Sequence, residues 1–116
     1  MNFKYKQKDI EMRKLECEKL RYKYPDRIPI ICEKYTTSRL EDLVKEKYLV
    51  PNELAAFQFM YIIRKRIKLA ETEALFFFVN GKYMLKTDTL MTDIYEEYKD
   101  SDGFLYITYA DENISG

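Results

Sequence analysis

Few side chains in this sequence could catalyse a reaction, because its 116 residues include no histidine. Histidine is the usual general base near neutral pH, and its absence excludes Ser-His and Cys-His nucleophile pairs. Glu96 and Glu97 are adjacent carboxylates in a predicted helix, where neighbouring side chains point apart. No catalytic constellation is visible, so we expect that the protein is not an enzyme and uses no cofactor.

The two cysteines offer no recognisable site either. Cys17 and Cys32 match no zinc spacing and no redox motif, so no metal site is expected. A chain of this length can bury a core without covalent staples. We interpret both residues as reduced cysteines of a cytosolic protein, and a disulfide between them stays an open alternative.

Charge is balanced overall but unevenly distributed. Residues 1–27 hold nine Lys or Arg and five acids, a difference of +4, whereas residues 87–116 hold one Lys and eight acids, a difference of −7. This asymmetry indicates either a face built for acidic partners or two solvated faces that attract each other. No RNA-binding motif or phosphate loop is present, so we expect no nucleic-acid partner.

The elements that must position any site follow from hydrophobic periodicity and turn signals. Apolar spacing predicts helices over 10–24, 53–69 and 90–98, with a short turn within 3–8 and a helical turn around Leu40–Val44. Strands are predicted over 27–35, 48–51, 75–79, 82–85 and 104–109, and Asn80-Gly81 predicts a hairpin turn. The expected N-caps are Asp9 and Asn52, and the third helix is expected to turn inward Leu90, Met91, Ile94 and Tyr98.

This mixture of helices and strands predicts an α+β fold in a single domain spanning residues 1–116. From residue 28 onward, the order ββαββαβ resembles the ubiquitin-like β-grasp, with a helix laid across a mixed sheet. Residues 1–26 then form an N-terminal helical extension, residues 27–110 the β-grasp core, and residues 111–116 a flexible conjugation tail.

Several collinear segments resemble the autophagy ubiquitin-like modifier family, of the GABARAP type. They are KLRYKYPDRIPIICEK (19–34), KYLVP (47–51), FQFMYIIRKRI (57–67), ALFFFVNG (74–81), IYEEYKDSDGFLYITY (94–109) and the final Gly116. The resemblance covers nearly the whole chain, in order. It departs after Asn80, where family members usually have a Pro-Pro turn and this chain has none, and at Glu46, where Lys is frequent.

The resemblance implies that Gly116 is joined through its carboxyl group to phosphatidylethanolamine. A terminal glycine suits passage through a narrow enzyme channel, since it has no side chain to clash. The implied partners are an E1-like activating enzyme, an E2-like conjugating enzyme, a processing or deconjugating cysteine protease, and a membrane containing phosphatidylethanolamine. The implied localisation is cytoplasmic, and autophagosomal or vesicular after lipidation.

The resemblance also implies a peptide groove along the strand Tyr48–Pro51, which binds motifs of cargo receptors and adaptors by strand addition. An aromatic pocket would be lined by Glu16, Leu20, Pro29, Ile31, Lys47, Leu49 and Phe104. An aliphatic pocket would be lined by Tyr48, Val50, Pro51, Leu54, Phe59 and Ile62. A charged rim of Arg27, Lys45 and Arg66, with Lys47, would meet acidic residues that flank the motif.

An alternative stays open, in which the chain is a ubiquitin-like peptide-binding adaptor that is never conjugated. It would keep the groove and would not need Gly116.

Overall fold

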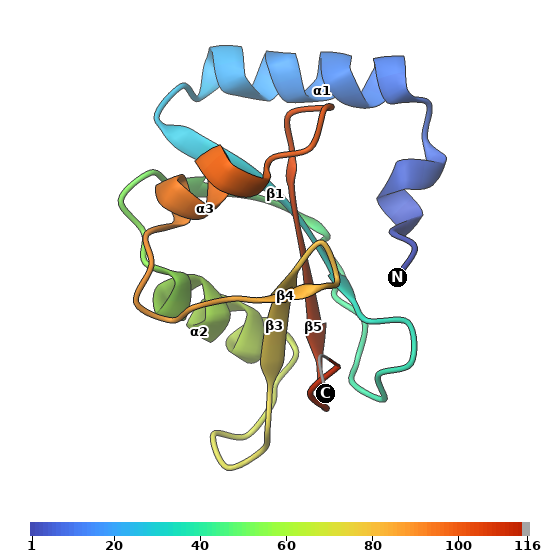
Figure 1. Ribbon diagram of the computed structural model, residues 1–116, viewed down its shortest axis with the longest axis vertical. Coiled ribbons are helices and arrows are strands. Elements are labelled where there is room, and N and C mark those ends of the chain that lie inside the picture. The colour runs from blue at the N-terminus through green and yellow to red at the C-terminus, as the bar shows by residue number, and fades with distance from the viewer. Residues whose placement is uncertain (115–116) are drawn as a thin grey trace.

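The computed structural model describes residues 1–114 (Figure 1). A 3₁₀ turn at Lys4–Gln7 precedes three helices, α1 (Ile10–Lys23), α2 (Ala56–Arg66) and α3 (Met91–Tyr98). The strands are β1 (Arg27–Lys34), β2 (Lys47–Pro51), β3 (Phe76–Val79), β4 (Tyr83–Met84) and β5 (Leu105–Ala110). The predicted order of elements and the α+β class are confirmed, and so is the short turn before α1.

All five strands form one mixed sheet in the order β2-β1-β5-β3-β4. The central pair, β1 and β5, is parallel, and the other pairs are antiparallel. This arrangement, with α2 across one side of the sheet, is the predicted ubiquitin-like grasp (Figure 1). Figure 1 shows α1 at one end of the molecule and the C-terminal end of β5 at the other.

Alternation along β1 divides the core between the two faces of the sheet. Ile28, Ile30 and Cys32 point into the larger cluster, which includes the buried residues of α2 and α3. Ile31 points to the other face, into a smaller cluster with Phe3, Tyr5, Cys17, Phe104 and Tyr106. The N-terminal extension therefore supplies a second hydrophobic layer, which covers the face of the sheet that α2 leaves open.

The predicted start of α2 at residue 53, with Asn52 as its N-cap, is wrong. The helix begins at Ala56 with Ala55 as the N-cap residue. Ala55 instead forms an isolated antiparallel bridge with Leu90, and the Leu54 carbonyl accepts a hydrogen bond from the Met91 amide at 2.8 Å. Residues 54 and 55 are extended because they pair with the start of α3, so the helix begins only at Ala56. Sequence periodicity does not reveal such a tertiary contact.

Two smaller expectations also fail. The segment 40–44 contains no helical turn, because its backbone is held by other elements: the Tyr109 hydroxyl donates to the Glu41 carbonyl at 2.6 Å. Leu90 is 42% exposed rather than inward, since it is the N-cap residue of α3. Tyr95 takes the inward position, and its hydroxyl donates to the Gly103 carbonyl at 2.7 Å.

The hairpin predicted at Asn80-Gly81 is confirmed. Both residues have positive φ, 57° and 65°, as a type I′ turn requires. A Cβ atom on Gly81 would lie 2.7 Å from Met1 Cβ, so the first residue of the chain packs directly on this turn. Glycine is needed here both for backbone conformation and for the close approach of the N-terminus.

Both cysteines are free and buried, and they lie in different hydrophobic clusters: Cys17 in the smaller and Cys32 in the larger. Burial raises the pKa of the Cys17 thiol to about 12 and also raises the pKa of Cys32. Because the thiolate is the nucleophile, a pKa of about 12 leaves roughly 10³-fold less thiolate at pH 8 than an unperturbed cysteine has.

We therefore predict that the folded protein reacts with iodoacetamide at pH 8 at least about 100-fold more slowly than a free cysteine. The rate is read by mass spectrometry, and the same chain in denaturant, where both thiols should react at the free rate, is the control. Fast labelling of one thiol in the folded protein would contradict the burial described above.

Candidate functional site

The site begins with an unpaired strand edge. β2 is the outermost strand and pairs only with β1, in a register that sets Leu49 opposite Pro29 and Tyr48 opposite Ile30. Its other edge is free of any strand within the described residues. Because successive side chains alternate, Lys47 and Leu49 face α1, while Tyr48 and Val50 face the core beneath α2. An extended peptide added here would meet a different wall on each face.

A cavity of about 600 Å³ lies on the α1 side of β2. It joins α1, the loop before β2 and β2 itself, and it is lined by Leu20, Tyr24, Arg27, Val44, Lys45, Glu46, Lys47 and Leu49. Three members of the predicted aromatic pocket, Leu20, Lys47 and Leu49, are therefore on its wall, as are Arg27 and Lys45 of the predicted rim.

Sequence reasoning missed Tyr24, Val44 and Glu46. Tyr24 lies one helical turn beyond Leu20, a spacing that puts both on the same side of α1, and this signal was available in the sequence. Val44 is fully exposed in a polar loop, and only the folded chain shows that this loop borders the cavity.

The other predicted members of the aromatic pocket lie below the cavity or beside it. Pro29, Ile31 and Phe104 are buried, the last two in the smaller cluster against which Leu20 packs. Glu16 of α1 forms a hydrogen-bonded ion pair with Lys47 of β2, and both side chains are about one-third exposed, at 34% and 30%. The ion pair spans α1 and β2 at the edge of the cavity.

On the opposite face, the residues predicted for the aliphatic pocket form the outer layer of the core. Tyr48, Val50 and Phe59 are buried, and the rings of Tyr48 and Phe59 meet edge to face with centroids 6.1 Å apart. Burial raises the pKa of Tyr48 to about 12, and nearby Arg66 opposes that shift, which places this rim residue within electrostatic reach. The remaining members, Leu54 and Ile62, are half-buried, and Pro51 is exposed at the end of β2.

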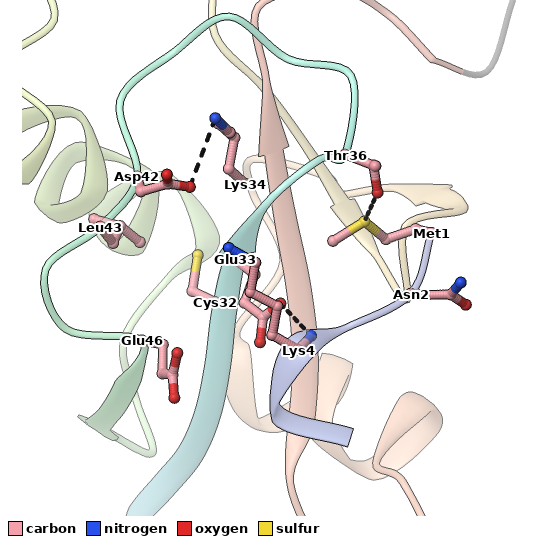
Figure 2. A pocket seen from close by; sticks show the side chains of 10 residues that line it. All are labelled: Met1, Asn2, Lys4, Cys32, Glu33, Lys34, Thr36, Asp42, Leu43 and Glu46. Atoms are coloured by element: carbon pink, nitrogen blue, oxygen red, sulfur yellow. Dashed lines mark hydrogen bonds and ion pairs between the residues drawn. The ribbon is translucent and has the colours of Figure 1, made fainter. Parts of the chain in front are cut away.

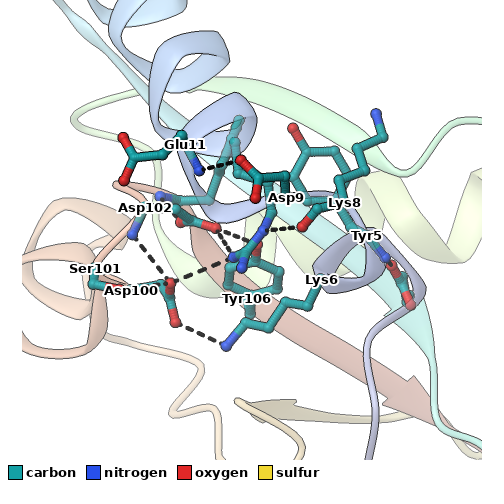
Figure 3. Close-up of polar contacts among 12 residues, drawn as sticks. Tyr5, Lys6, Lys8, Asp9, Glu11, Asp100, Ser101, Asp102 and Tyr106 are labelled. Carbon is teal, nitrogen blue, oxygen red and sulfur yellow. Dashed lines mark hydrogen bonds and ion pairs between the residues drawn. The ribbon is translucent and has the colours of Figure 1, made fainter.

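A buried polar network fastens the N-terminal extension to the sheet (Figure 3). The guanidinium of Arg13 donates to the Asp102 carboxylate at 2.6 Å, and the Tyr106 hydroxyl donates to the same oxygen at 2.5 Å. Burial works to lower the pKa of Arg13, but its hydrogen bonds outweigh burial and the pKa is raised. Beside this network, Lys6 pairs with Asp100 at 2.8 Å.

These contacts resolve part of the charge asymmetry seen in the sequence. Two of the N-terminal cations are neutralised by two of the C-terminal acids, so the two segments attract each other across the fold. Of the three cations that line the cavity, Lys47 pairs with Glu16, and Arg27 and Lys45 remain to face a ligand.

A second cavity, of about 340 Å³, lies between the first residues of the chain and the loop that follows β1 (Figure 2). On its wall, the buried Glu33 carboxylate accepts the backbone N–H groups of Lys4 and Tyr5 at 2.8 and 2.9 Å. Burial raises the pKa of Glu33, and the hydrogen bond from Lys4 opposes the shift. Lys34 and Asp42 pair across the rim at 3.6 Å.

Gly116, the expected conjugation residue, lies outside the described residues. No helix within residues 1–114 has the length and apolarity needed to cross a membrane. The same residues contain no group of three or more His, Cys, Asp or Glu side chains placed to hold a metal ion.

Comparisons with known proteins agree with this fold. The profile of the family described as "Autophagy protein Atg8 ubiquitin like" matches residues 12–116. The autophagy-related protein 8 of Mycosarcoma maydis is 53% identical over 107 residues, which cover 92% of this chain and 90% of that protein.

Two solved structures are also similar. The crystal structure of Trypanosoma brucei ATG8 superposes with a TM-score of 0.90 at 42% identity, covering 95% of each chain. Plasmodium falciparum Atg8, solved in complex with a Plasmodium falciparum Atg3 peptide, superposes with a TM-score of 0.86 at 35% identity, covering 97% of this chain and 98% of that one. The chain therefore belongs to the Atg8 family of ubiquitin-like autophagy proteins.

Proposed function

We propose that this protein is a GABARAP-type ubiquitin-like modifier, conjugated through Gly116 to phosphatidylethanolamine, that recruits cargo receptors and adaptors through the groove along β2. The observation that carries the proposal is the free β2 edge, flanked by an open cavity on one face and by a half-buried apolar layer on the other. The chain acts as one unit over residues 1–116, with residues 111–116 as the conjugation tail. It is the substrate of the conjugating enzymes rather than an enzyme itself.

The groove suits a peptide with an aromatic anchor and an aliphatic anchor three positions later. Side chains at positions i and i+3 of an extended strand point to opposite faces, about 10 Å apart. An added strand on β2 would place one anchor over Leu49 and Lys47, beside the cavity, and the other over Tyr48 and Val50. The geometry of this edge therefore supports one two-pocket groove rather than two separate sites.

Charge supports the same class of ligand. The cavity wall and its rim carry Arg27, Lys45 and Lys47 against a single acid, Glu46, and Lys47 is already paired with Glu16. Acidic residues beside the anchors would add favourable contacts with the unpaired cations and would raise the association rate. Acidic flanks are therefore part of the proposed motif.

Conjugation would give the protein a stable membrane anchor. Each buried lipid CH₂ contributes about 0.8 kcal/mol, so a phospholipid with two acyl chains holds a small protein firmly, whereas one chain alone is marginal. The proposed partners are an E1-like and an E2-like enzyme and a processing or deconjugating cysteine protease. The Plasmodium relative solved in complex with an Atg3 peptide supports the E2-like partner. The proposed location is the cytoplasm and, after lipidation, autophagosomal or vesicular membranes.

The test is mass spectrometry of the C-terminal peptide from the membrane and soluble fractions of cells in which autophagy is induced. We expect the mass of phosphatidylethanolamine on Gly116 in the membrane fraction only. If Gly116 is unmodified in both fractions while motif peptides still bind, the unconjugated adaptor is the correct function.

The groove itself is tested by Leu49→Arg. This half-buried residue lies on the cavity wall, so a charged side chain there should exclude the aromatic anchor and weaken binding of a motif peptide by at least about tenfold. The measurement is the Kd of a fluorescent peptide that carries both anchors and an acidic flank.

Leu15→Arg provides the matched control for the groove. Leu15 is 52% exposed on α1 and does not line the cavity, so the same change of chemistry should leave the Kd within about twofold of the wild type. Equal affinity of the Leu49→Arg and Leu15→Arg proteins would place peptide binding elsewhere on the surface.

A further inference from the structure

The Tyr5 hydroxyl is one of two buried side-chain polar atoms within residues 1–114 that lack a hydrogen-bond partner. The Tyr5 side chain is almost completely enclosed, with 1% of the residue exposed. Figure 3 shows the Tyr106 hydroxyl engaged in the contacts around Asp102 and the Tyr5 hydroxyl outside them. Buried hydroxyl groups in proteins are nearly always paired, so this exception calls for a partner that the free chain does not supply.

Tyr5 lies under the aromatic side of the proposed groove. Its ring meets the ring of Phe104 edge to face, with centroids 5.3 Å apart. Tyr5 and Ile31 belong to the smaller cluster, and Leu20 packs against that cluster. From β2, the Lys47 ammonium lies 5.8 Å from the centroid of the Tyr5 ring. Of the side chains on the cavity wall, Lys47 therefore lies near the Tyr5 ring, and Leu20 packs against the cluster to which Tyr5 belongs.

The cover over Tyr5 on this side includes movable side chains. Lys47 is held by its ion pair with Glu16, and the two side chains are 30% and 34% exposed. Ion pairs with this much solvent contact contribute little to stability, so this one can separate at small cost when a ligand enters. Leu20 is half-buried and can change rotamer without moving the backbone. An aromatic ring that displaces this cover would arrive at the Tyr5 and Phe104 rings.

We propose that the Tyr5 hydroxyl is a specificity-determining contact of the groove, which accepts a hydrogen bond from the indole N–H of a tryptophan anchor and so favours tryptophan over phenylalanine. This inference rests on the proposed peptide-binding function. Indole carries a single N–H donor and no acceptor, and the phenol oxygen of Tyr5 is a free acceptor. Phenylalanine fills the same space and leaves that oxygen without a partner.

The test compares two peptides that differ only in the anchor, tryptophan or phenylalanine, each with an aliphatic residue three positions later and an acidic flank. Their Kd values are measured for the wild type and for Tyr5→Phe, which removes one oxygen atom and keeps the ring in the cluster. The ratio Kd(Phe)/Kd(Trp) should fall by about fivefold in Tyr5→Phe, the effect of one net hydrogen bond.

Tyr48→Phe is the matched control. The Tyr48 hydroxyl is the other buried and unpartnered side-chain atom of the described chain, but its ring packs in the larger cluster, on the face of the aliphatic anchor. Its removal should leave the Kd ratio unchanged, because neither peptide changes its anchor on that face.

The outcomes separate the inference from the function on which it rests. A ratio that is equal in wild type and Tyr5→Phe, while both peptides bind, overturns the role of Tyr5 and leaves the groove intact. Failure of the wild type to bind either peptide overturns both. A ratio that falls in Tyr48→Phe as much as in Tyr5→Phe also overturns the assignment, since it would show a general response to the loss of a buried hydroxyl.

Discussion

Replacing Asp102 with alanine is expected to lower the free energy of unfolding by about 3–5 kcal/mol. The Asp102 carboxylate is buried, and it accepts hydrogen bonds from Arg13, from the Tyr106 hydroxyl and from the Phe104 backbone amide. The alanine variant takes the nearest counter-charge from the guanidinium, which is only 10% exposed, and leaves it only the longer contact with Asp100 at 3.9 Å. Since small domains are stable by only about 5–15 kcal/mol, this one change should remove a large part of the total.

Chemical denaturation followed by circular dichroism measures this loss. Lys6→Gln is the control, because it removes the neighbouring ion pair between Lys6 and Asp100. The Lys6 side chain is 39% exposed, so this change should lower the free energy of unfolding by about 1 kcal/mol or less. Adding Arg13→Met to Asp102→Ala should recover part of the stability, since it removes a buried charge that has lost its nearest partner. Equal losses in Asp102→Ala and Lys6→Gln would show that the buried pair is no stronger than the surface pair.

The Asp102 network also links stability to the proposed function. Arg13 belongs to α1, which supplies Leu20 to the cavity and ends just before Tyr24. Asp102 lies three residues before β5 and accepts a hydrogen bond from the amide of the buried Phe104. The Arg13–Asp102 pair therefore holds one wall of the groove against the sheet. The core beneath α2 contains no residue of the N-terminal extension, so this pair makes an added helix part of the proposed binding site.

Much of the fold was predictable because it depends on local signals. The β-branched residues of 27–35, the alternation through 104–109 and the turn signal Asn80-Gly81 are properties of short segments. The two strands were confirmed to within one residue at their ends, and so was the turn. The start of α2 was not predictable, because Ala55 bridges Leu90 across a long stretch of sequence. The conformation of residues 40–44 likewise depends on a hydrogen bond from Tyr109, which no local pattern encodes.

The residues of the candidate site also differ in whether a local sequence pattern predicts them. Residues 47–51 are contiguous, so their alternation places Lys47 and Leu49 on one face and Tyr48 on the other as soon as the strand is recognised. The contributions of Val44 and of the Tyr5 hydroxyl need the folded chain. The first lies in a loop without periodicity, and the second is defined by the absence of a partner in three dimensions.

The second large effect is expected at the proposed point of conjugation, where Gly116→Ala should reduce the lipid-linked product to about one-hundredth of the wild type or less. The added methyl group leaves the carboxyl group chemically competent. It widens a terminus that the conjugating enzymes must thread and align, and a displacement of about 1 Å at a reacting centre can cost about 100-fold in rate. The product is measured by mass spectrometry of the membrane fraction.

Two controls give this result its meaning. Glu112→Ala, at an exposed position of the same tail, should leave conjugation within about twofold of the wild type. Gly116→Ala itself should bind motif peptides with unchanged Kd, because the groove lies on β2 and α1, whereas β5 ends at the opposite end of the molecule (Figure 1). Full conjugation of Gly116→Ala would refute the role of the glycine. Loss of conjugation together with loss of peptide binding would point instead to a folding defect, because the groove and the tail are far apart and both depend on the folded domain.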